Sequence, residues 1–531
     1  MRTRIPCGGG LTPRPGGLDS DALPRAGRRR GNARSREDVI LDLLVVGGGI
    51  HGAAVARDAT LRGLSVLLAE RGDLAGATSS RTSKLVHGGI RYLERGEIPL
   101  VREALRERAI LLRIAPDLVH PLTFVLPSYR GEGRPPWMLR AGLWLYGALA
   151  GRDPLSAHRH MDAAGLLRFE PALRSRGLRG GFVFRDAQMD DALLCVATAL
   201  AAERAGAGIR TYTEVRGLER TSAGWRARLA DLERGVEEAV EARWVVNAAG
   251  PWADRVRALG RPSVDPVVRR TRGTHVVLEG SLVSSAILLT ARRDGRVFFV
   301  IPWGTHTVIG TTDVDDKRDP DQVGPDPGDI RYLLEEAARA LPSLRAGALP
   351  VRAFAGVRPL AGKAAGGGTP SANRREHRVL EEDRLVSIVG GKYTTHRALA
   401  AHVVDRIIAI DGRRAPACST ADSLVSGGRA AGIEGMSTQH PRSLELPGGL
   451  QLREAEVAFA VRYEKAKRLD DVLLRRTRLW LDGRALREAA GPVSEWMGTL
   501  RGWNDAARRE MLEQFRRALD DEVRILEEGT A

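Results

Sequence analysis

The 531-residue chain has few cysteines, few aromatic residues and no long apolar run. Its three cysteines, Cys7, Cys195 and Cys418, lie far apart and form no CxxC pair. This spacing argues against a disulfide scaffold, a zinc ribbon and an iron–sulfur ligand set, so we predict no metal site and a reducing cytoplasm. The longest apolar stretch, GLWLYGALA at 142–150, is too short to span a membrane; of a helix in a membrane interface and a buried helix, we expect the buried helix.

Acidic residues are also in deficit, with 66 Asp and Glu against 82 Lys and Arg and a net charge of +16. This balance favours an anionic partner such as a phosphorylated substrate, an anionic lipid surface or nucleic acid, although genomic base composition explains it equally well. Nucleic acid is disfavoured because no RRM, helix-turn-helix or zinc-finger pattern occurs and the basic residues are not interleaved with aromatic ones.

Composition divides the chain into four segments. Residues 1–37 are rich in Arg, Gly and Pro and lack the apolar core of a signal peptide, so we expect a disordered extension. Residues 38–414 carry the ordered domains, 415–449 have the composition of a linker, and 450–528 are predicted to form a helical cap. In the cap, residues 505–523 place four apolar side chains on one helical side, which is either a packing face or a membrane-docking stripe.

A strand, a glycine turn and a helix open the ordered part. Residues 42–46 predict a buried parallel strand, 50–61 a helix, and 65–69 a second strand closed by Glu70. Between them Gly47, Gly49 and Gly52 form G-x-G-x-x-G, in which the glycines permit a tight turn, close approach of a pyrophosphate and close helix–strand packing. Glu70 is placed to accept the ribose hydroxyls and to repel the 2′-phosphate of NADP.

Later segments predict how the remaining chain is organised. Short strands and polar turns at 179–190 and 296–314 favour an antiparallel sheet, and a helix is expected over 97–115. The apolar runs 244–250 and 385–391 are expected to return to the first sheet. The predicted fold is therefore α/β, with a Rossmann-like FAD-binding domain interleaved with an antiparallel-sheet substrate domain, plus the helical C-terminal cap.

The segment after Glu70 distinguishes FAD from NAD. An NAD enzyme usually continues to a third strand and helix, whereas this chain enters ATSSRTSKLVHGG, a polar loop able to wrap a diphosphate and reach a flavin ring. A second strand end, VNAAGPWAD at 246–254, is placed to pass the same cofactor at Gly250. Together the two segments favour FAD.

Five motifs make a family resemblance recognisable. SSRTSKLVHGGIRYLE (79–94), VVNAAGPWAD (245–254), VIPWGTHTVIGTTDVD (300–315), AGVRPL (355–360) and GGKYTTHRALA (390–400) occur in this order. Together they resemble the FAD-dependent glycerol-3-phosphate dehydrogenases of the aerobic respiratory chain, within the D-amino-acid-oxidase-like flavoproteins. The resemblance covers residues 38 to about 410.

The resemblance assigns roles to individual residues. It implies that Thr78, Ser79, Ser83, Lys84, His87, Gly391 and Lys392 contact FAD, and that Arg91, Tyr92, Thr312 and Arg375 bind the substrate. Arg375 is the implied phosphate ligand, with the adjacent Arg374 as the alternative. It also implies a catalytic group of His275, Arg358 and Lys392. An imidazole suits the base that must remove the hydroxyl proton, and cations suit a phosphate and an anionic reduced flavin.

The implied reaction is oxidation of glycerol 3-phosphate to dihydroxyacetone phosphate, with electrons passed to a quinone. Peripheral attachment to the cytoplasmic face of a bacterial membrane and a homodimer are further implications. Three alternatives stay open: an oxidase of the same substrate that uses oxygen, a related amine oxidoreductase, and a non-catalytic flavoprotein.

Overall fold

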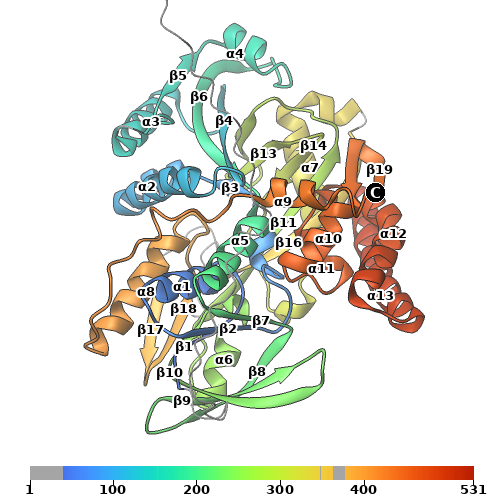
Figure 1. Cartoon of the computed structure of the whole chain (residues 1–531). Helices are drawn as coiled ribbons and strands as arrows, with labels where there is room; N and C mark the ends of the chain where they lie inside the picture. Colours follow the sequence, from blue (N-terminus) through green and yellow to red (C-terminus); the bar gives the residue numbers. More distant parts are fainter. Residues whose placement is uncertain (1–39, 152, 347, 363–376) are drawn as a thin grey trace, which may run out of the picture. The chain divides into compact units, whose positions relative to one another are not determined.

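The computed structural model describes residues 40–531 apart from 152, 347 and 363–376 (Figure 1). The predicted extension 1–37 and the predicted phosphate ligand Arg375 therefore lie outside the described residues, and Arg91 is described only through its backbone.

The first sheet has the parallel core that the glycine motif requires. Its strands follow the order β18-β10-β1-β2-β7, with β17 antiparallel at one edge and β8 and β9 continuing from β10. The register pairs Leu44 of β1 with Leu67 of β2 and with Val245 of β10. The bounds are β1 Leu41–Val46, β2 Val66–Glu70, β7 Gly208–Thr211, β8 Thr213–Arg220, β9 Trp225–Asp231, β10 Val236–Asn247, β17 Arg378–Glu382 and β18 Leu385–Val389.

Helices cover this sheet through small and apolar side chains. Helix α1 (Ile50–Leu61) has the predicted bounds, and its buried Ala53 and Ala56 share a hydrophobic core with α5 (Asp191–Arg204) and α8 (His396–Ile410). Helix α6 (Ala253–Gly260) contacts β8. Because β10 and β18 return to the sheet begun by β1, the two predicted returns of the chain are confirmed.

The second sheet is largely antiparallel, as predicted, and runs β15-β11-β14-β13-β12-β4-β6-β3, with β16 paired to β11 and β5 to β6. Residues 157–162 (AHRHMD) contain strand β5. The bounds are β3 Leu85–Val86, β4 Val119–Tyr129, β5 His158–Met161, β6 Leu178–Met189, β11 Val268–Glu279, β12 Ala286–Thr290, β13 Val297–Trp303, β14 His306–Gly310, β15 Val314–Asp315 and β16 Pro350–Ala361.

The C-terminal region is helical and packs on the second sheet through β16 (Figure 1). The stretch expected as a linker contains α9 (Arg429–Met436) and β19 (Ser443–Leu446), which pairs with β20 (Leu450–Arg453). Helices α10 (Glu454–Tyr463), α11 (Leu469–Arg475), α12 (Gly483–Arg501) and α13 (Asp505–Thr530) follow.

The apolar stripe of α13 is a packing face. Phe515 and Leu519 are buried, and Met511 and Leu512 pack against the same core cluster. The membrane-docking hypothesis for this stripe is therefore wrong, because its side chains are already covered by protein.

Helix α3 (Pro136–Ala150) departs from expectation in the opposite sense. Only Leu143 and Tyr146 of its fifteen residues are buried, so the segment that reads as a buried helix lies largely at the surface. It contacts α2 (Ile98–Ile114), and both it and α4 (Ala163–Phe169) contact β5 and β6. Helix α7 (Pro327–Ala340) contacts β11. No helix in the described part of the chain is long and apolar enough to cross a membrane.

Candidate active site

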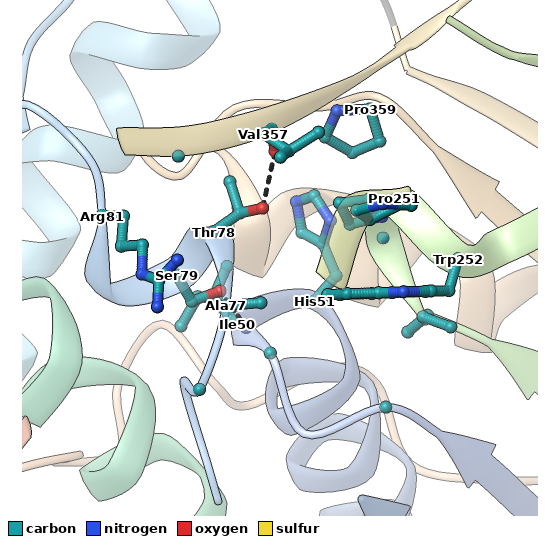
Figure 2. A pocket seen from close by; sticks show the side chains of 18 of the residues that line it. Ile50, His51, Ala77, Thr78, Ser79, Arg81, Pro251, Trp252, Val357 and Pro359 are labelled. Carbon is teal, nitrogen blue, oxygen red and sulfur yellow. Dashed lines mark hydrogen bonds between the residues drawn. The ribbon is translucent and has the colours of Figure 1, made fainter. Parts of the chain in front are cut away.

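One cavity of about 850 Å³ lies where the nucleotide turn, the loop after β2, β11, β16 and the segment after β18 meet. Figure 2 shows this region, with Thr78 and Ser79 on one side and His51, Pro251 and Trp252 on another. The Thr78 hydroxyl donates to the carbonyl oxygen of Val357 at 2.6 Å and so joins the loop to β16. The predicted residues that line the cavity are Gly47, Gly49, Glu70, Thr78, Ser79, Ser83, His87, Tyr92, Gly250, His275, Arg358, Gly391 and Lys392.

The glycine turn is shaped by contacts that no side chain tolerates. Gly47 has φ +110°, and a Cβ there would lie 2.7 Å from the carbonyl oxygen of Ala248. A Cβ on Gly52 would lie 1.9 Å from the carbonyl oxygen of Gly47. The N–H of Ile50 at the start of α1 donates to Ser79 Oγ at 3.0 Å. The turn therefore brings bare backbone and the positive end of a helix to the cavity wall, which suits an anionic diphosphate.

Glu70 closes β2 beside this turn. Its two carboxylate oxygens accept backbone N–H groups of Gly48 and Gly72 at 2.6 and 2.8 Å. Burial raises the pKa of this carboxyl, and the two backbone N–H groups partly oppose the rise. The N–H bonds fix the carboxylate at the cavity wall, and each oxygen keeps a lone pair for a ribose hydroxyl.

His275 comes from β11 and is almost fully buried. Its Nε2 lies 2.9 Å from Ser83 Oγ, and its ring stacks on Phe354 with 4.8 Å between centroids. A Cβ on the paired residue Gly310 would lie 2.1 Å from the His275 ring, so only glycine leaves room for the imidazole. Burial, assisted by the charges of Arg358 and Lys84, holds the pKa of His275 well below its usual value, so the ring is neutral at pH 7.

Arg358 comes from the neighbouring strand β16. It donates to Thr311 Oγ1 at 2.9 Å and to the carbonyl oxygen of Thr312 at 3.1 Å, and it lies 3.3 Å from a carboxylate oxygen of Asp313. A Cβ on Gly273 would lie 2.2 Å from its guanidinium. The turn after β14 and a glycine on β11 thus hold the guanidinium in one position at the cavity.

Lys392 and Tyr92 meet at the same cavity although 300 residues separate them. The Lys392 Nζ lies 3.5 Å from the centroid of the Tyr92 ring, a cation–π distance. The backbone before Lys392 is left-handed, with φ +91° at Gly391, where a Cβ would lie 2.7 Å from the His51 ring. Burial lowers the pKa of His51 to about 4, so this ring too is neutral.

Three predicted residues in the described part of the chain do not line the cavity: Gly52, which packs against the Gly47 carbonyl, Lys84 and Thr312. The Lys84 side chain does not line the cavity; it is buried, forms an ion pair with Asp191 and lies over the Trp480 ring. Thr312 is also buried outside the cavity wall, where its hydroxyl accepts the N–H of Thr274 at 2.9 Å. The Lys84 side chain braces the loop, and Thr311, the neighbour of Thr312, lines the cavity.

Sequence reasoning missed the residues that the cap supplies. Arg468, Asp470 and Arg475 line the cavity, because two arginines in and just after α11 bind Asp73 in the loop after β2. No local signal reveals this, since the partners lie some 400 residues apart. Basic side chains outnumber acidic ones in the wall, which favours an anionic ligand. The basic ones are Arg71, Arg81, Arg216, Arg255, Arg358, Lys392, Arg468 and Arg475.

The residues present fit a flavin dinucleotide. The cavity begins at a glycine turn with a carboxylate at the end of the next strand and continues past polar loop residues to His275. The cradle at Gly47, which a Cβ would fill, leaves room for a diphosphate, and His275 turns its Nε2 toward Ser83 at the far end of the cavity.

Comparisons with known proteins identify the family. Residues 42–406 match the FAD dependent oxidoreductase family, and residues 386–508 match the C-terminal domain of alpha-glycerophosphate oxidase. Glycerol-3-phosphate dehydrogenase 2 of Mycobacterium tuberculosis is 36% identical over 506 residues, covering 86% of this chain and 85% of the relative. The chain belongs to the FAD-dependent glycerol-3-phosphate dehydrogenase family. The enzyme is thus a flavoprotein oxidoreductase with FAD as cofactor.

Two further similarities concern substrate and fold. D-erythritol 1-phosphate dehydrogenase of Brucella abortus is 36% identical over 481 residues, covering 83% of this chain and 94% of the relative. The solved structure of the Bacillus halodurans glycerol-3-phosphate dehydrogenase complexed with FAD has a TM-score of 0.73. It is 24% identical and covers 92% of this chain and 96% of its own, and it supports the fold.

Proposed function

We propose that the enzyme oxidises sn-glycerol 3-phosphate to dihydroxyacetone phosphate and passes the electrons to a membrane quinone. The observation that carries the proposal is the convergence of Arg358, Lys392 and a neutral His275 on the cavity that begins at the glycine turn. A phosphate needs cations, and removal of a hydroxyl proton needs an uncharged base.

The cofactor would lie along the wall that runs from the turn to the second sheet. Gly47 would permit the tight turn, Gly49 the close approach of the diphosphate and Gly52 the close helix–strand packing beneath it. Glu70 would accept the ribose hydroxyls. When bound, FAD supplies a hydride acceptor for the secondary alcohol. The other proposed cofactor contacts are Thr78, Ser79, Ser83, His87, Gly250, Gly391 and Lys392.

The substrate would be held by cations and hydroxyls on the opposite wall. Arg358, fixed by Thr311 and Asp313, presents a guanidinium to the phosphate or the carbinol oxygen. Lys392 and Tyr92 would bind the remaining oxygens. On the family resemblance alone, Arg91 and Arg375 complete the phosphate site.

The hydroxyl proton would move to His275 Nε2, which now shares a hydrogen bond with Ser83 Oγ. The charge of Arg358 is one cause of the low pKa of His275. A dianionic phosphate beside Arg358 offsets that charge, so substrate binding raises the pKa of His275 and strengthens the base just before it is needed.

The electron acceptor distinguishes a dehydrogenase from an oxidase. A quinone acceptor is consistent with the basic charge of the protein, which favours an anionic membrane surface. The proposed enzyme is a homodimer attached to the cytoplasmic face of a bacterial membrane. The alternative is an oxidase that passes the electrons to oxygen. It is supported by the match of residues 386–508 to the C-terminal domain of alpha-glycerophosphate oxidase. Quinone-dye reduction without peroxide supports the dehydrogenase, and stoichiometric peroxide supports the oxidase.

The second candidate substrate is D-erythritol 1-phosphate, favoured by the Brucella abortus relative. Anaerobic mixing of the FAD-loaded enzyme with each phosphate tests both. We expect glycerol 3-phosphate to bleach the flavin absorbance, and faster bleaching by erythritol 1-phosphate at equal concentration would reassign the substrate. No bleaching by either phosphate would refute the proposed reaction.

A further inference from the structure

Two arginines in the wall of the cavity of about 850 Å³ lack the acidic partner that the other wall arginines have. The paired ones, each within 4.0 Å of a carboxylate oxygen of the protein, are Arg71, Arg216, Arg255, Arg358 and Arg475. Arg81 and Arg468 have no carboxylate oxygen within this distance in the described part of the chain. A guanidinium that lines a cavity without a carboxylate beside it favours an anionic ligand.

Arg81 belongs to the loop between β2 and β3 and lies on the same side of the cavity as Thr78 and Ser79 (Figure 2). A Cβ on Gly356 would lie 2.6 Å from the carbonyl oxygen of Arg81, so the loop backbone packs directly on β16. The Arg81 side chain is exposed although protein surrounds it, because it reaches into the cavity. This enclosure lowers the pKa of Arg81, and the charge of Arg475 lowers it further. An anion beside Arg81 would offset both effects.

The position of Arg81 in its loop is next to the expected diphosphate. Two residues before it, Ser79 Oγ accepts the N–H of Ile50 at the start of α1 at 3.0 Å. At this N-terminus the glycine turn presents backbone N–H groups to an anion, so a diphosphate bound there lies beside the loop that carries Arg81. A phosphate of the cofactor is therefore the anion that this position favours.

Arg468 reaches the cavity from the cap. It precedes α11, and its guanidinium lies 4.5 Å from the centroid of the Tyr212 ring. Tyr212 donates its backbone N–H to the carbonyl oxygen of Gly72 at 2.9 Å and its hydroxyl to Asp471 of α11 at 2.7 Å. The N–H of Gly72 in turn donates to a carboxylate oxygen of Glu70. Arg468 therefore lies at the end of the cavity where Glu70 would accept the ribose hydroxyls.

We propose that the cap is part of the cofactor site: Arg81 of the loop and Arg468 of the cap both bind phosphate oxygens of FAD, so that cofactor binding and docking of the cap stabilise each other. The ion pairs of Asp73 with Arg475 and Arg476 already hold the cap to the loop after β2. Bound FAD adds a second link between the same two segments, and such coupling is reciprocal. The inference rests on FAD as the cofactor and needs neither the proposed substrate nor the proposed electron acceptor.

The first test is release of FAD from the purified holoenzyme after dilution, followed by the rise in flavin fluorescence. Arg81→Gln and Arg468→Gln should each release FAD at least about tenfold faster than the wild type, because each loses a hydrogen bond between two charged groups. Arg81→Lys should recover part of the retention, since it keeps the charge without the planar guanidinium. The matched control is Arg478→Gln, which removes an exposed arginine of the cap that does not line the cavity and should release FAD as the wild type does.

Melting temperatures with and without FAD separate a cofactor contact from a structural role. Removal of the Arg81 guanidinium breaks no ion pair in the described part of the chain, so Arg81→Gln should lower only the melting temperature of the FAD-loaded protein. Arg475→Gln breaks ion pairs with Asp73 and Asp471 and should lower both melting temperatures. An equal loss by Arg81→Gln with and without FAD would overturn the assignment.

Hydrogen exchange of residues 464–476 in the full chain tests the link to the cap. FAD should slow exchange there in the wild type, and Arg468→Gln should abolish the slowing. Unchanged FAD release in either glutamine variant, or cap exchange that FAD does not affect, would overturn the proposal. So would an Arg81→Gln enzyme that retains FAD as the wild type does but has a raised KM for glycerol 3-phosphate, because Arg81 would then hold the substrate phosphate.

The two proposals fail in different ways. FAD release, melting and hydrogen exchange need no substrate, so a flavin that glycerol 3-phosphate does not bleach removes the proposed reaction alone. Bleaching that stays intact while the arginine variants retain FAD removes only the role of the cap.

Discussion

Two roles compete for Lys84: the family resemblance implies a cofactor contact, whereas its contacts in the protein are those of a residue that braces the loop. Its ammonium is buried, pairs with Asp191, donates to the carbonyl oxygen of Ser80 at 3.2 Å and lies 4.1 Å from the Trp480 ring centroid. Lys84→Met removes all three interactions and leaves the Asp191 carboxylate buried without its cation.

The expected cost follows from these contacts. Breaking a buried ion pair by removing one partner costs about 3 to 5 kcal/mol. Asp191 keeps three donors, the N–H and hydroxyl of Thr82 and the N–H of Ala192, which places the loss at the lower end. We therefore expect Lys84→Met to lower the free energy of unfolding of the FAD-free protein by about 3 kcal/mol.

Urea unfolding of the FAD-free protein, followed by tryptophan fluorescence, measures this loss. The control is Lys84→Met/Asp191→Asn, which removes both charges and should recover part of the stability. A loss below about 1 kcal/mol, together with an FAD affinity weakened more than about tenfold, would refute the bracing role and restore the cofactor contact.

Three further outcomes are expected. His275→Gln should slow flavin bleaching by about 10² to 10⁴ with little change in KM, since it removes the base and keeps the shape; an unchanged rate would exclude the role. Gly391→Ala should lower the melting temperature more than Gly412→Ala, because both have positive φ but only the first Cβ meets a neighbour, the His51 ring at 2.7 Å. Burial lowers the pKa of His51 to about 4 and of His396 to about 3, so below pH 6.5 the unfolded chain takes up protons that the folded chain does not. The free energy of unfolding should therefore fall as pH drops from 6.5 to 4, by up to about 1.4 kcal/mol per pH unit for each histidine. His396→Gln should reduce that slope, and an unchanged slope would mean that His396 is not buried neutral.

Local sequence determined the nucleotide half of the fold. The strand, helix and second strand around the glycine turn have nearly the predicted bounds, because a buried parallel strand, a tight turn and an alanine-rich helix each leave a short-range pattern. The family motifs then placed His275, Arg358 and Lys392 in one reaction before any geometry was known, and all three line one cavity.

Tertiary structure decided which polar and apolar side chains remain accessible. Lys84 and Thr312 have polar side chains in the family motifs. In the interior, however, the Lys84 ammonium pairs with Asp191 and the Thr312 hydroxyl donates to Asp329. Arg475 of the cap lies at the cavity because it and Arg476 both form ion pairs with Asp73, which is some 400 residues earlier in the chain.

The two apolar helices show the same division most clearly. Periodicity gives α13 an apolar stripe and gives α3 a nearly continuous apolar run, but it does not state what each faces. The core covers the stripe of α13, while two tryptophans of α3 stay at the surface. Hydrophobic pattern is a property of the chain itself, whereas burial depends on which other segments arrive to cover it, and that is settled by long-range packing.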